Sequence, residues 1–434
     1  MMRNRIFIYE FISGGGFNKV DIPASLFCEG FGMLKSIIED FKSIGFEITT
    51  LLDYRIYQLS GLLLIDNFRV IQREDNYLKQ FKILVKNCEY VFVIAPESTN
   101  ILYQLTNIVT KYNKILLSTS LEGIKIGTSK IQTYEFFQKN KVKTPKTYLI
   151  PLKRNKLDSE FIIRKFHELS KPIVIKPEDG VGAESIYFFE TENEIKKFFQ
   201  DYQYKIEIGR YYILQEYIRG KDLSLSLINI PRFLNPTAKG PYLLSVNSQN
   251  VNIKDHKYDS EYFGGYTPIK NYNEISNSLT KVLHKIEFSQ FFGYFGIDLI
   301  RTTDMQYYFI EINPRLTTSY IGLRNSINKN PAQLILNSKL NGLMPKNVKV
   351  RNFSLFRRIQ MEYYKPLPSS DLKEQLTHNL IELIPELVTP PISLNESNQF
   401  TCLIATKTND LNSSKKRFQE IKQLLEEFDF TILK

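Results

Sequence analysis

The feature that most constrains the fold of this chain is a continuous apolar run at residues 90–95, YVFVIA, which Pro96 closes. A run that is apolar on both faces is typical of a parallel strand buried between helices. Helical periodicity follows at residues 101–112, and a second short strand at residues 114–118. A similar alternation of strand and helix begins near Ile6. This alternation predicts a doubly wound sheet.

Composition narrows the class of protein without identifying it. The 434 residues are 43% hydrophobic and include 57 Lys and Arg against 46 Asp and Glu, a net charge of +11. The basic residues are scattered, which disfavours nucleic acid as a partner. No run of about 18 uncharged apolar residues occurs, so we expect no membrane partner. Three distant cysteines, Cys28, Cys88 and Cys402, predict free thiols, and we expect a cytoplasmic location.

The pattern changes beyond residue 118, where short strands suited to hairpins are interleaved with helices. A later pair of strands at residues 296–301 and 307–312 is joined by a short polar loop. We therefore expect a doubly wound N-terminal domain, a small α+β lid, an antiparallel domain and an accessory α+β region at the C-terminal end. Their expected bounds are residues 1–118, 119–225, 226–344 and 345–434.

The pair of late strands carries the most informative constellation. Asp298 lies in GIDLI, and Glu311 follows thirteen residues later in YYFIEINPRL. On adjacent antiparallel strands both carboxylates can point to one face, and Asn313 shares the face of Glu311. Two carboxylates and an amide oxygen are a ligand set that Mg²⁺ prefers, with phosphates completing the octahedron. Arg315 is suited to a developing negative charge.

A lysine followed by a glycine loop forms a second candidate. Lys176 lies near the end of an apolar strand, IVIKP, and the loop PEDGVGAES follows. Backbone N–H groups around Gly180 and Gly182 could cradle phosphates, although glycines in this position also mark ordinary hairpin turns. Lys130, at the start of a helix at residues 129–140, is uninformative alone.

A third candidate is the segment LQEYIRGKD at residues 214–222. Its pattern indicates a strand, a turn and a second strand, and an edge backbone here could bond an adenine while Asp222 reaches a ribose. Taken alone, the segment predicts only a hairpin.

Taken in order, these features resemble the ATP-grasp superfamily. The matching segments are SKIQTYEFF, VKTPKTY, VIKPEDGVGAESI, ILQEYIRGKDLSLSLI, YFGIDLI and FIEINPRLTTSYIGL. Within the superfamily the chain is most similar to the family of ligases that join glutamate to tyramine. The resemblance implies an ATP-grasp fold, with residues 345–434 similar to the small cap of some larger members.

The resemblance also implies roles for individual residues. The nucleotide would be held by two lysines, a closing loop, an adenine-facing strand and a ribose-binding carboxylate: Lys130 and Lys176; Gly180, Gly182 and Ser185; Gln215, Glu216 and Tyr217; and Asp222. Asp298, Glu311 and Asn313 would bind Mg²⁺, with Mn²⁺ as the alternative ion. Lys176 and Arg315 are the implied catalytic residues, with Arg315 steadying the transferred phosphoryl group.

The implied reaction is ATP-dependent ligation of a small-molecule carboxylate to an amine, through an acyl phosphate, with release of ADP and phosphate. Glutamate and tyramine are the first candidates, and a homodimer is an open alternative. Substrate contacts are expected from a glycine turn, a polar strand face, a glycine pair and a threonine: Ser13, Gly14 and Gly15; Ser245, Asn247 and Gln249; Gly264 and Gly265; and Thr317. His256 is a candidate base for the amine, against the alternative of an exposed histidine.

Two other functions stay open at this point. The first is another ATP-grasp reaction, either amino-acid tailing or a carboxylase-type step. The second is a non-enzymatic nucleotide- or RNA-binding scaffold, which only the net charge of +11 favours.

Overall fold

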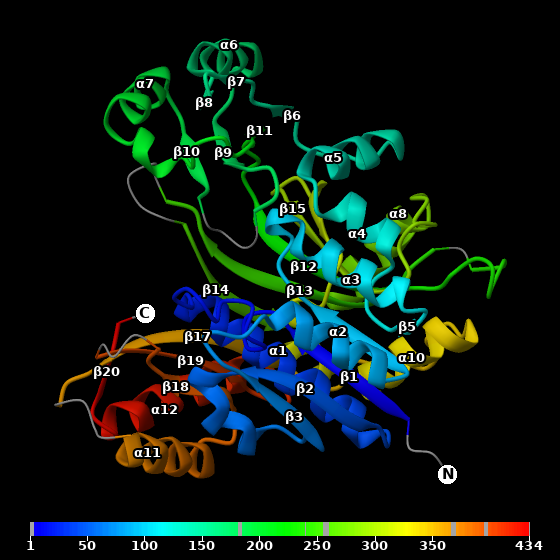
Figure 1. The fold of residues 1–434 in the computed structure, drawn as a ribbon. Coiled ribbons are helices and arrows are strands. Elements are labelled where there is room, and N and C mark those ends of the chain that lie inside the picture. Colours follow the sequence, from blue (N-terminus) through cyan, green and yellow to red (C-terminus); the bar gives the residue numbers. More distant parts are fainter. Residues whose placement is uncertain are drawn as a thin grey trace.

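The computed structural model describes residues 4–180, 185–238, 240–254, 260–365, 370–394 and 398–433. Their strands form a five-stranded, a four-stranded and a nine-stranded sheet, with a separate two-stranded hairpin. In Figure 1 the four-stranded sheet and its helices stand above the other two sheets. Among the described residues, no helix combines the length and the apolar character that crossing a membrane requires.

The five-stranded sheet is parallel, in the order β3-β2-β1-β4-β5. Its strands are β1 (Arg5–Glu10), β2 (Glu47–Asp53), β3 (Asn67–Ile71), β4 (Tyr90–Ile94) and β5 (Ile115–Leu116). The connections contain α1 (Ala24–Ser43), η1 (Tyr54–Leu62), α2 (Tyr77–Asn87), η2 (Ser98–Asn100) and α3 (Ile101–Lys111). The predicted doubly wound sheet is confirmed. Its winding reverses between β1 and β4, and such a reversal leaves a crevice at the carboxyl ends of the strands.

The four-stranded sheet is antiparallel, in the order β10-β9-β11-β6. Its strands are β6 (Thr147–Leu149), β9 (Ile173–Pro177), β10 (Tyr187–Phe189) and β11 (Tyr212–Glu216). Nearby elements are α4 (Leu121–Gly127), α5 (Lys130–Lys139), the hairpin β7 (Leu152–Lys153) and β8 (Lys156–Leu157), α6 (Ser159–Leu169), α7 (Glu192–Asp201) and η3 (Gln203–Lys205). Ile173 and Ile175 pack with residues of α6 and α7, so strand alternation turns Val174 and Lys176 toward a cavity.

The nine-stranded sheet runs in the order β16-β15-β12-β13-β14-β17-β19-β18, with β20 on β17. Its strands are β12 (Lys221–Asn229), β13 (Tyr242–Asn252), β14 (Glu261–Thr267), β15 (Gly293–Arg301), β16 (Tyr307–Asn313), β17 (Ser354–Tyr363), β18 (Leu387–Ile392), β19 (Gln399–Ala405) and β20 (Phe430–Ile432). Its helices are α8 (Tyr272–Leu283), α9 (Ser319–Ser326), α10 (Pro331–Asn341), α11 (Ser370–Leu383) and α12 (Leu411–Glu427). All of its described strand pairs are antiparallel.

The strands of the accessory region predicted at residues 345–434 extend the large sheet. β17 pairs with β14 through Gly264 opposite Arg357, so the strands beyond residue 345 continue the sheet that carries Asp298 and Glu311. An exposed edge on β14 would leave a row of unpaired backbone groups, and β17 satisfies them. The charged helix α12 belongs to the same region.

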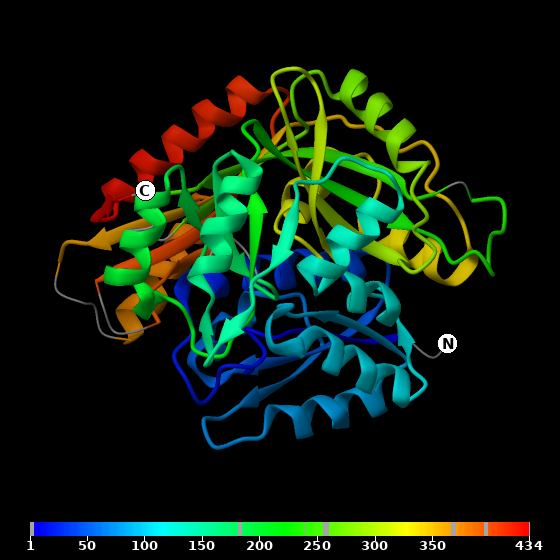
Figure 2. The same ribbon diagram turned by 90° about the horizontal axis from the view of Figure 1, so that it is seen from above.

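Helix α1 connects the N-terminal sheet to the C-terminal strands. Its Gly32 packs on Leu403 of β19, and Thr389 of β18 donates its hydroxyl to the carbonyl of Cys28 at 2.7 Å. Figure 2, viewed from above, shows the C-terminal strands and α12 on one side of the molecule. The three cysteines are free and buried, as predicted. Burial raises the pKa of the Cys402 thiol, which removes it as a nucleophile.

The other end of α1 is held by one buried charge. Asp40 accepts a hydrogen bond from the Tyr320 hydroxyl at 2.7 Å and pairs with Arg324 Nη2 at 2.8 Å. Both partners belong to α9. Because the carboxylate is almost fully buried, it anchors α9 against α1 and positions the segment that follows β16.

We expect Asp40→Ala to lower the free energy of unfolding by about 3 kcal/mol, because it leaves the buried Tyr320 hydroxyl without its acceptor and removes one of the two carboxylates that pair with Arg324. Glu160→Ala is the control, since that pair with Lys153 is largely exposed and such pairs contribute about 1 kcal/mol or less. Urea unfolding followed by circular dichroism measures both changes. Equal effects of the two variants would contradict the anchoring role of Asp40.

Candidate active site

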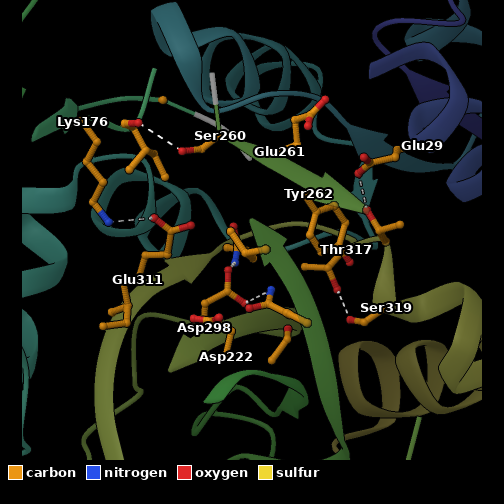
Figure 3. A pocket seen from close by; sticks show the side chains of 18 of the residues that line it. Glu29, Lys176, Asp222, Ser260, Glu261, Tyr262, Asp298, Glu311, Thr317 and Ser319 are labelled. Atoms are coloured by element: carbon orange, nitrogen blue, oxygen red, sulfur yellow. Dashed lines mark hydrogen bonds and ion pairs between the residues drawn. The ribbon is translucent and has the colours of Figure 1, made fainter. Parts of the chain in front are cut away.

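A cavity of about 360 Å³ lies where the three sheets meet. Its walls come from the carboxyl ends of β1 and β4, from α1, from the open face of β9 and β11, and from strands β12 to β17 of the large sheet. Figure 3 shows Lys176 and Glu311 facing each other at one side of the cavity and Glu29 at the other, with Asp298 and Tyr262 in between. The crevice at the β1–β4 switch point therefore opens onto the nine-stranded antiparallel sheet.

Asp298 and Glu311 are directly opposite each other on β15 and β16. Asn313 donates from Nδ2 to Asp298 Oδ2 at 2.9 Å, and Gln249 of β13 donates from Nε2 to Asp298 Oδ1 at 3.0 Å. Burial and, secondarily, the charge of Glu311 raise the pKa of Asp298. The predicted convergence of the two carboxylates and the amide on one face is thus present.

The donor set suits a hard divalent cation. The two carboxylates and the Asn313 amide offer only oxygen as ligand atoms, as Mg²⁺ requires. Within the described ranges, no group of three His, Cys, Asp or Glu side chains is placed to hold a metal. A cation here would take its remaining ligands from phosphate and water, as Mg²⁺ does at nucleotide sites. The assignment of these three residues as metal ligands stays a prediction.

Two lysines bring positive charge to Glu311. The Nζ atoms of Lys130 and Lys176 lie 3.7 and 3.9 Å from Glu311 Oε2, and Lys130 also donates to the carbonyl oxygen of Gly180 at 2.6 Å. Burial lowers the pKa of Lys176 to about 8, although Glu311 opposes this shift. Burial would raise the pKa of Glu311, but the lysines outweigh it and leave the pKa lowered. An ionised carboxylate with two cations is suited to receive phosphates.

The segment predicted to contact adenine and ribose begins in β11 of the lid sheet and ends in β12 of the large sheet. Gln215, Glu216, Tyr217 and Asp222 all line the cavity. Gln215 donates from Nε2 to Thr147 Oγ1 at 2.8 Å, while Glu216 forms an ion pair with Lys171. Burial raises the pKa of Asp222 to about 6. The predicted hairpin is therefore a connection between two sheets, and its residues face one ligand space.

Arg315 is held from a distant part of the chain. Its Nε lies 2.9 Å from Glu97 Oε1, and its Nη1 donates to the carbonyl oxygen of Leu316 at 3.1 Å. Glu97 follows β4, whereas Arg315 follows β16, so this ion pair joins the N-terminal domain to the large sheet. The guanidinium remains at the cavity wall, where it can meet negative charge.

Only two of the predicted substrate residues, Gln249 and Thr317, line this cavity. Ser245 and Asn247 share the polar strand face of Gln249, as expected from their spacing. However, both are buried and bonded to each other, with Ser245 Oγ donating to Asn247 Oδ1 at 2.8 Å. Asn247 also donates to Ser226 Oγ at 3.2 Å. These two residues stabilise the sheet interior and do not reach the ligand space.

The two glycine segments are explained by packing. A side chain at Gly264 would collide with the carbonyl of Phe356, and one at Gly265 with the carbonyl of Ser248, so both glycines permit close strand approach. The turn of Ser13, Gly14 and Gly15 packs inward on Tyr9 and Ile71. These five residues do not line the cavity, and their contact with substrate stays a prediction.

Two predicted residues lie outside the described part of the chain: Gly182 and His256. Ser185 is described and has a positive φ of 55°, but it does not line the cavity. Of the described residues in the loop after Lys176, Pro177 and Gly180 line the cavity.

Among the cavity residues that sequence reasoning did not identify are Glu10, Glu29, Tyr262 and Arg358. Glu10 ends β1 and accepts hydrogen bonds from the backbone N–H of Ile12 and Ser13 at 3.0 and 2.7 Å. Glu29 of α1 accepts from the Thr318 hydroxyl at 2.8 Å. The available signal is charge within otherwise apolar strands, such as Glu10 in RIFIYEF and Arg357 and Arg358 in SLFRRIQ.

Comparison with known proteins agrees with this architecture. Residues 128–319 match the family model of an ATP-grasp domain, and residues 46–124 match that of a pre ATP-grasp 3 domain. The tyramine–L-glutamate ligase of Methanocaldococcus fervens is 28% identical over 362 residues, covering 81% of this chain and 99% of the relative. The ligase of the same name from Methanocaldococcus jannaschii is 28% identical over 361 residues, covering 82% and 96%.

Two solved structures share the fold. An ATP-grasp superfamily protein from Archaeoglobus fulgidus has a TM-score of 0.58 at 22% identity, covering 93% of this chain and 99% of its own. An L-amino acid ligase from Bacillus licheniformis has a TM-score of 0.63 at 14% identity, covering 100% and 99%. At these identities the likeness concerns the fold alone.

We expect Glu311→Gln to lower nucleotide-dependent turnover by about 100- to 1000-fold, because it removes both a cation ligand and the counter-charge of two lysines. The rate of ADP release at several Mg²⁺ concentrations measures this loss. Asp304→Asn, in the exposed loop between β15 and β16, is the matched control and is expected to keep wild-type rates. Unchanged turnover in Glu311→Gln would remove the metal assignment.

Burial raises the pKa of Glu10 from 4.5 to about 7, despite its backbone hydrogen bonds. The folded state therefore holds this proton more tightly, and the resulting stability is full below about pH 4.5 and lost as the pH rises through 7. The shift corresponds to about 3 kcal/mol. We expect this pH-dependent component to be absent in Glu10→Gln and present in Glu160→Gln, as measured by urea unfolding between pH 4.5 and 8. Parallel profiles for wild type and Glu10→Gln would contradict it.

Proposed function

We propose, on the premise that this chain belongs to the ATP-grasp superfamily and is an ATP-dependent carboxylate–amine ligase, that it joins an amino acid to a primary amine. Glutamate and tyramine are the first pair to consider, because the ligases of Methanocaldococcus that it resembles carry those substrates in their names. The observation that carries the proposal is the placement of Glu311, Lys130 and Lys176 at one wall of a cavity whose opposite wall is α1.

The chemical difficulty is that a carboxylate is a poor electrophile. Transfer of the γ-phosphoryl group of ATP to one carboxylate oxygen forms an acyl phosphate and ADP. The ammonium ion first gives one proton to water, and the free amine nitrogen then attacks the carbonyl carbon; the C–O bond to phosphate breaks, and the nitrogen passes its second proton to the departing phosphate or to water. An amide, phosphate and ADP are the products. No protein nucleophile is needed, so the burial of the three cysteines is compatible with this route.

The charges at the nucleotide side support phosphoryl transfer. Lys130 and Lys176 would hold phosphate oxygens as they now hold Glu311, and Arg315, fixed by Glu97, would face the group in transfer. A divalent cation bound at Asp298, Glu311 and Asn313 would neutralise charge on the phosphates. Because these groups are buried, water is excluded and their electrostatic effect is strengthened.

The adenosine half of the nucleotide fits the edge of the lid sheet. Gln215 and the backbone of Glu216 and Tyr217 would meet the adenine, and Asp222 the ribose. Val174 and Ile218 add apolar surface at the same wall. This arrangement provides a flat apolar slot with polar groups at its end, as nucleotide bases require.

The amine is proposed to enter beside α1. Leu26, Met33 and Pro96 form an apolar wall there, and Glu29 adds a carboxylate. A primary amine reaches the enzyme as an ammonium ion, so Glu29 would bind its charge while the apolar wall receives its body. Tyr262, between Glu29 and Asp298 in Figure 3, separates this compartment from the metal ligands.

The function is tested by an ADP-release screen of purified enzyme with MgATP, in which amino acids are crossed with amines. ADP formation that requires both an acid and an amine, with the amide identified by mass spectrometry, is the expected result. Release of AMP would overturn the acyl phosphate route. ADP release that needs bicarbonate in place of an amine would indicate a carboxylase-type step.

We expect Glu29→Gln to raise KM for the amine about 10- to 100-fold with little change in kcat, because it removes a charge-assisted contact. Glu39→Gln is the control on the same helix, since Glu39 pairs with Arg324 Nη1 at 2.9 Å and does not line the cavity. Steady-state kinetics with varied amine measures both. A rise in KM for ATP instead of the amine would place Glu29 elsewhere in the reaction.

A further inference from the structure

Arg358 is the cavity residue whose charge the described structure leaves uncompensated. It lies on β17, lines the cavity and is only 7% exposed. Its Nε is buried without a hydrogen-bond acceptor, and within the described ranges the guanidinium takes part in no ion pair. The guanidinium carbon Cζ of Arg358 lies 5.5 Å from the centroid of the Phe263 ring. A cation in this state indicates a site for an anion.

The position of Arg358 distinguishes this anion from the phosphates of the nucleotide. Lys130 and Lys176 belong to α5 and β9 beside the lid, whereas Arg358 lies on the part of the large sheet that α1 covers. Leu403, which is opposite Arg358 in the ladder, packs on Gly32 of α1. The guanidinium is therefore on the substrate side of the cavity.

The chain that follows Arg315 connects the two arginines. After Arg315 it enters α9, where Gly322 packs on Phe356, two residues before Arg358 on β17. One short segment thus leads from the guanidinium expected at the phosphoryl group to the strand that carries Arg358. An acid held between them would present one carboxylate to each.

We propose that Arg358 binds a second, unreacting carboxylate of the acid substrate, so that the acids used by this enzyme carry two anionic groups. The inference rests on the proposed ligase function and assigns the substrate class of the same cavity. Arg358 is a specificity-determining residue, because its ligand is not the carboxylate that becomes phosphorylated. The planar guanidinium lies over the Phe263 ring and offers paired donors that match a carboxylate.

The test compares wild type with Arg358→Gln and Arg358→Lys, using glutamate, 4-aminobutyrate and 2-aminobutyrate as acids in the ADP-release assay. Each monoacid keeps one of the two carboxylates of glutamate. With wild type we expect glutamate to exceed both monoacids in kcat/KM by about 10- to 100-fold, the effect of one charge-assisted hydrogen bond. Arg358→Gln should remove this advantage through KM and leave the better monoacid within about threefold, with partial recovery in Arg358→Lys.

Arg357→Gln is the matched control. It removes the same charge from the next residue of β17, which strand alternation directs to the opposite face and which does not line the cavity. We expect it to keep the preference for glutamate. An equal loss for diacid and monoacid in Arg358→Gln, or an unchanged ratio, overturns the proposal and leaves the ligase function standing.

A binding measurement separates the two proposals when turnover fails. Glutarate, a diacid, should raise the Tm of wild type more than butyrate does, and Arg358→Gln should abolish that difference while Glu311→Gln keeps it. This result without acid-dependent ADP release would retain the anion site and overturn the ligase function. A purely structural role for Arg358 predicts a lower Tm of the ligand-free Arg358→Gln variant, whereas removal of an unpaired buried charge predicts an equal or higher one.

Discussion

The placement of charge on β15 and β16 is the constraint on which the rest of this structure depends. Asp298 and Glu311 are opposed on two apolar strands, and burial of both carboxylates is tolerable only with compensation. Compensation comes from Lys130 and Lys176, beside the lid sheet, and from an amide on β16. The need to neutralise one strand pair therefore draws two sheets together, and a cavity with charged groups in its wall lies between them.

The N-terminal domain completes the cavity through its own charged groups. Glu97 follows β4 and fixes Arg315, while Glu10 ends β1 and Glu29 lies on α1. All three come from the carboxyl ends of the switch-point strands or from the helix that follows β1, where an open parallel sheet offers its crevice. The fold thus separates cations for phosphate on the lid side from carboxylates on the side of α1.

Sequence reasoning was strongest where chemistry and spacing agree locally. The interval between Asp298 and Asn313 predicts a strand pair with a common face, and the structure contains it. The reasoning was weakest for long-range packing. Nothing in the sequence near Arg315 indicates that its partner is Glu97, 218 positions away. The glycine pair at residues 264–265 resembles a ligand-binding loop, because glycines required by close strand packing look the same in sequence as glycines in such a loop. The C-terminal strands likewise join the large sheet because β17 pairs with β14, and local sequence does not specify which strands pair.

That continuous sheet has a mechanical consequence. Asp298 on β15 and Arg358 on β17 belong to one sheet, in which each strand pairs with the next across β12, β13 and β14, with irregularities at Ser226–Leu227 and Gln249–Val251. Arg315 follows β16 and Arg358 lies on β17 of this same sheet, so the distance across the sheet would set the length of an acid held between the two arginines. Adjustment to ligand is left to Lys176 of the lid sheet and Lys130 of α5, which contact Glu311 of the large sheet through side-chain ion pairs. Selectivity for the size of the acid would therefore depend on the large sheet, and the timing of the reaction would depend on the lid sheet.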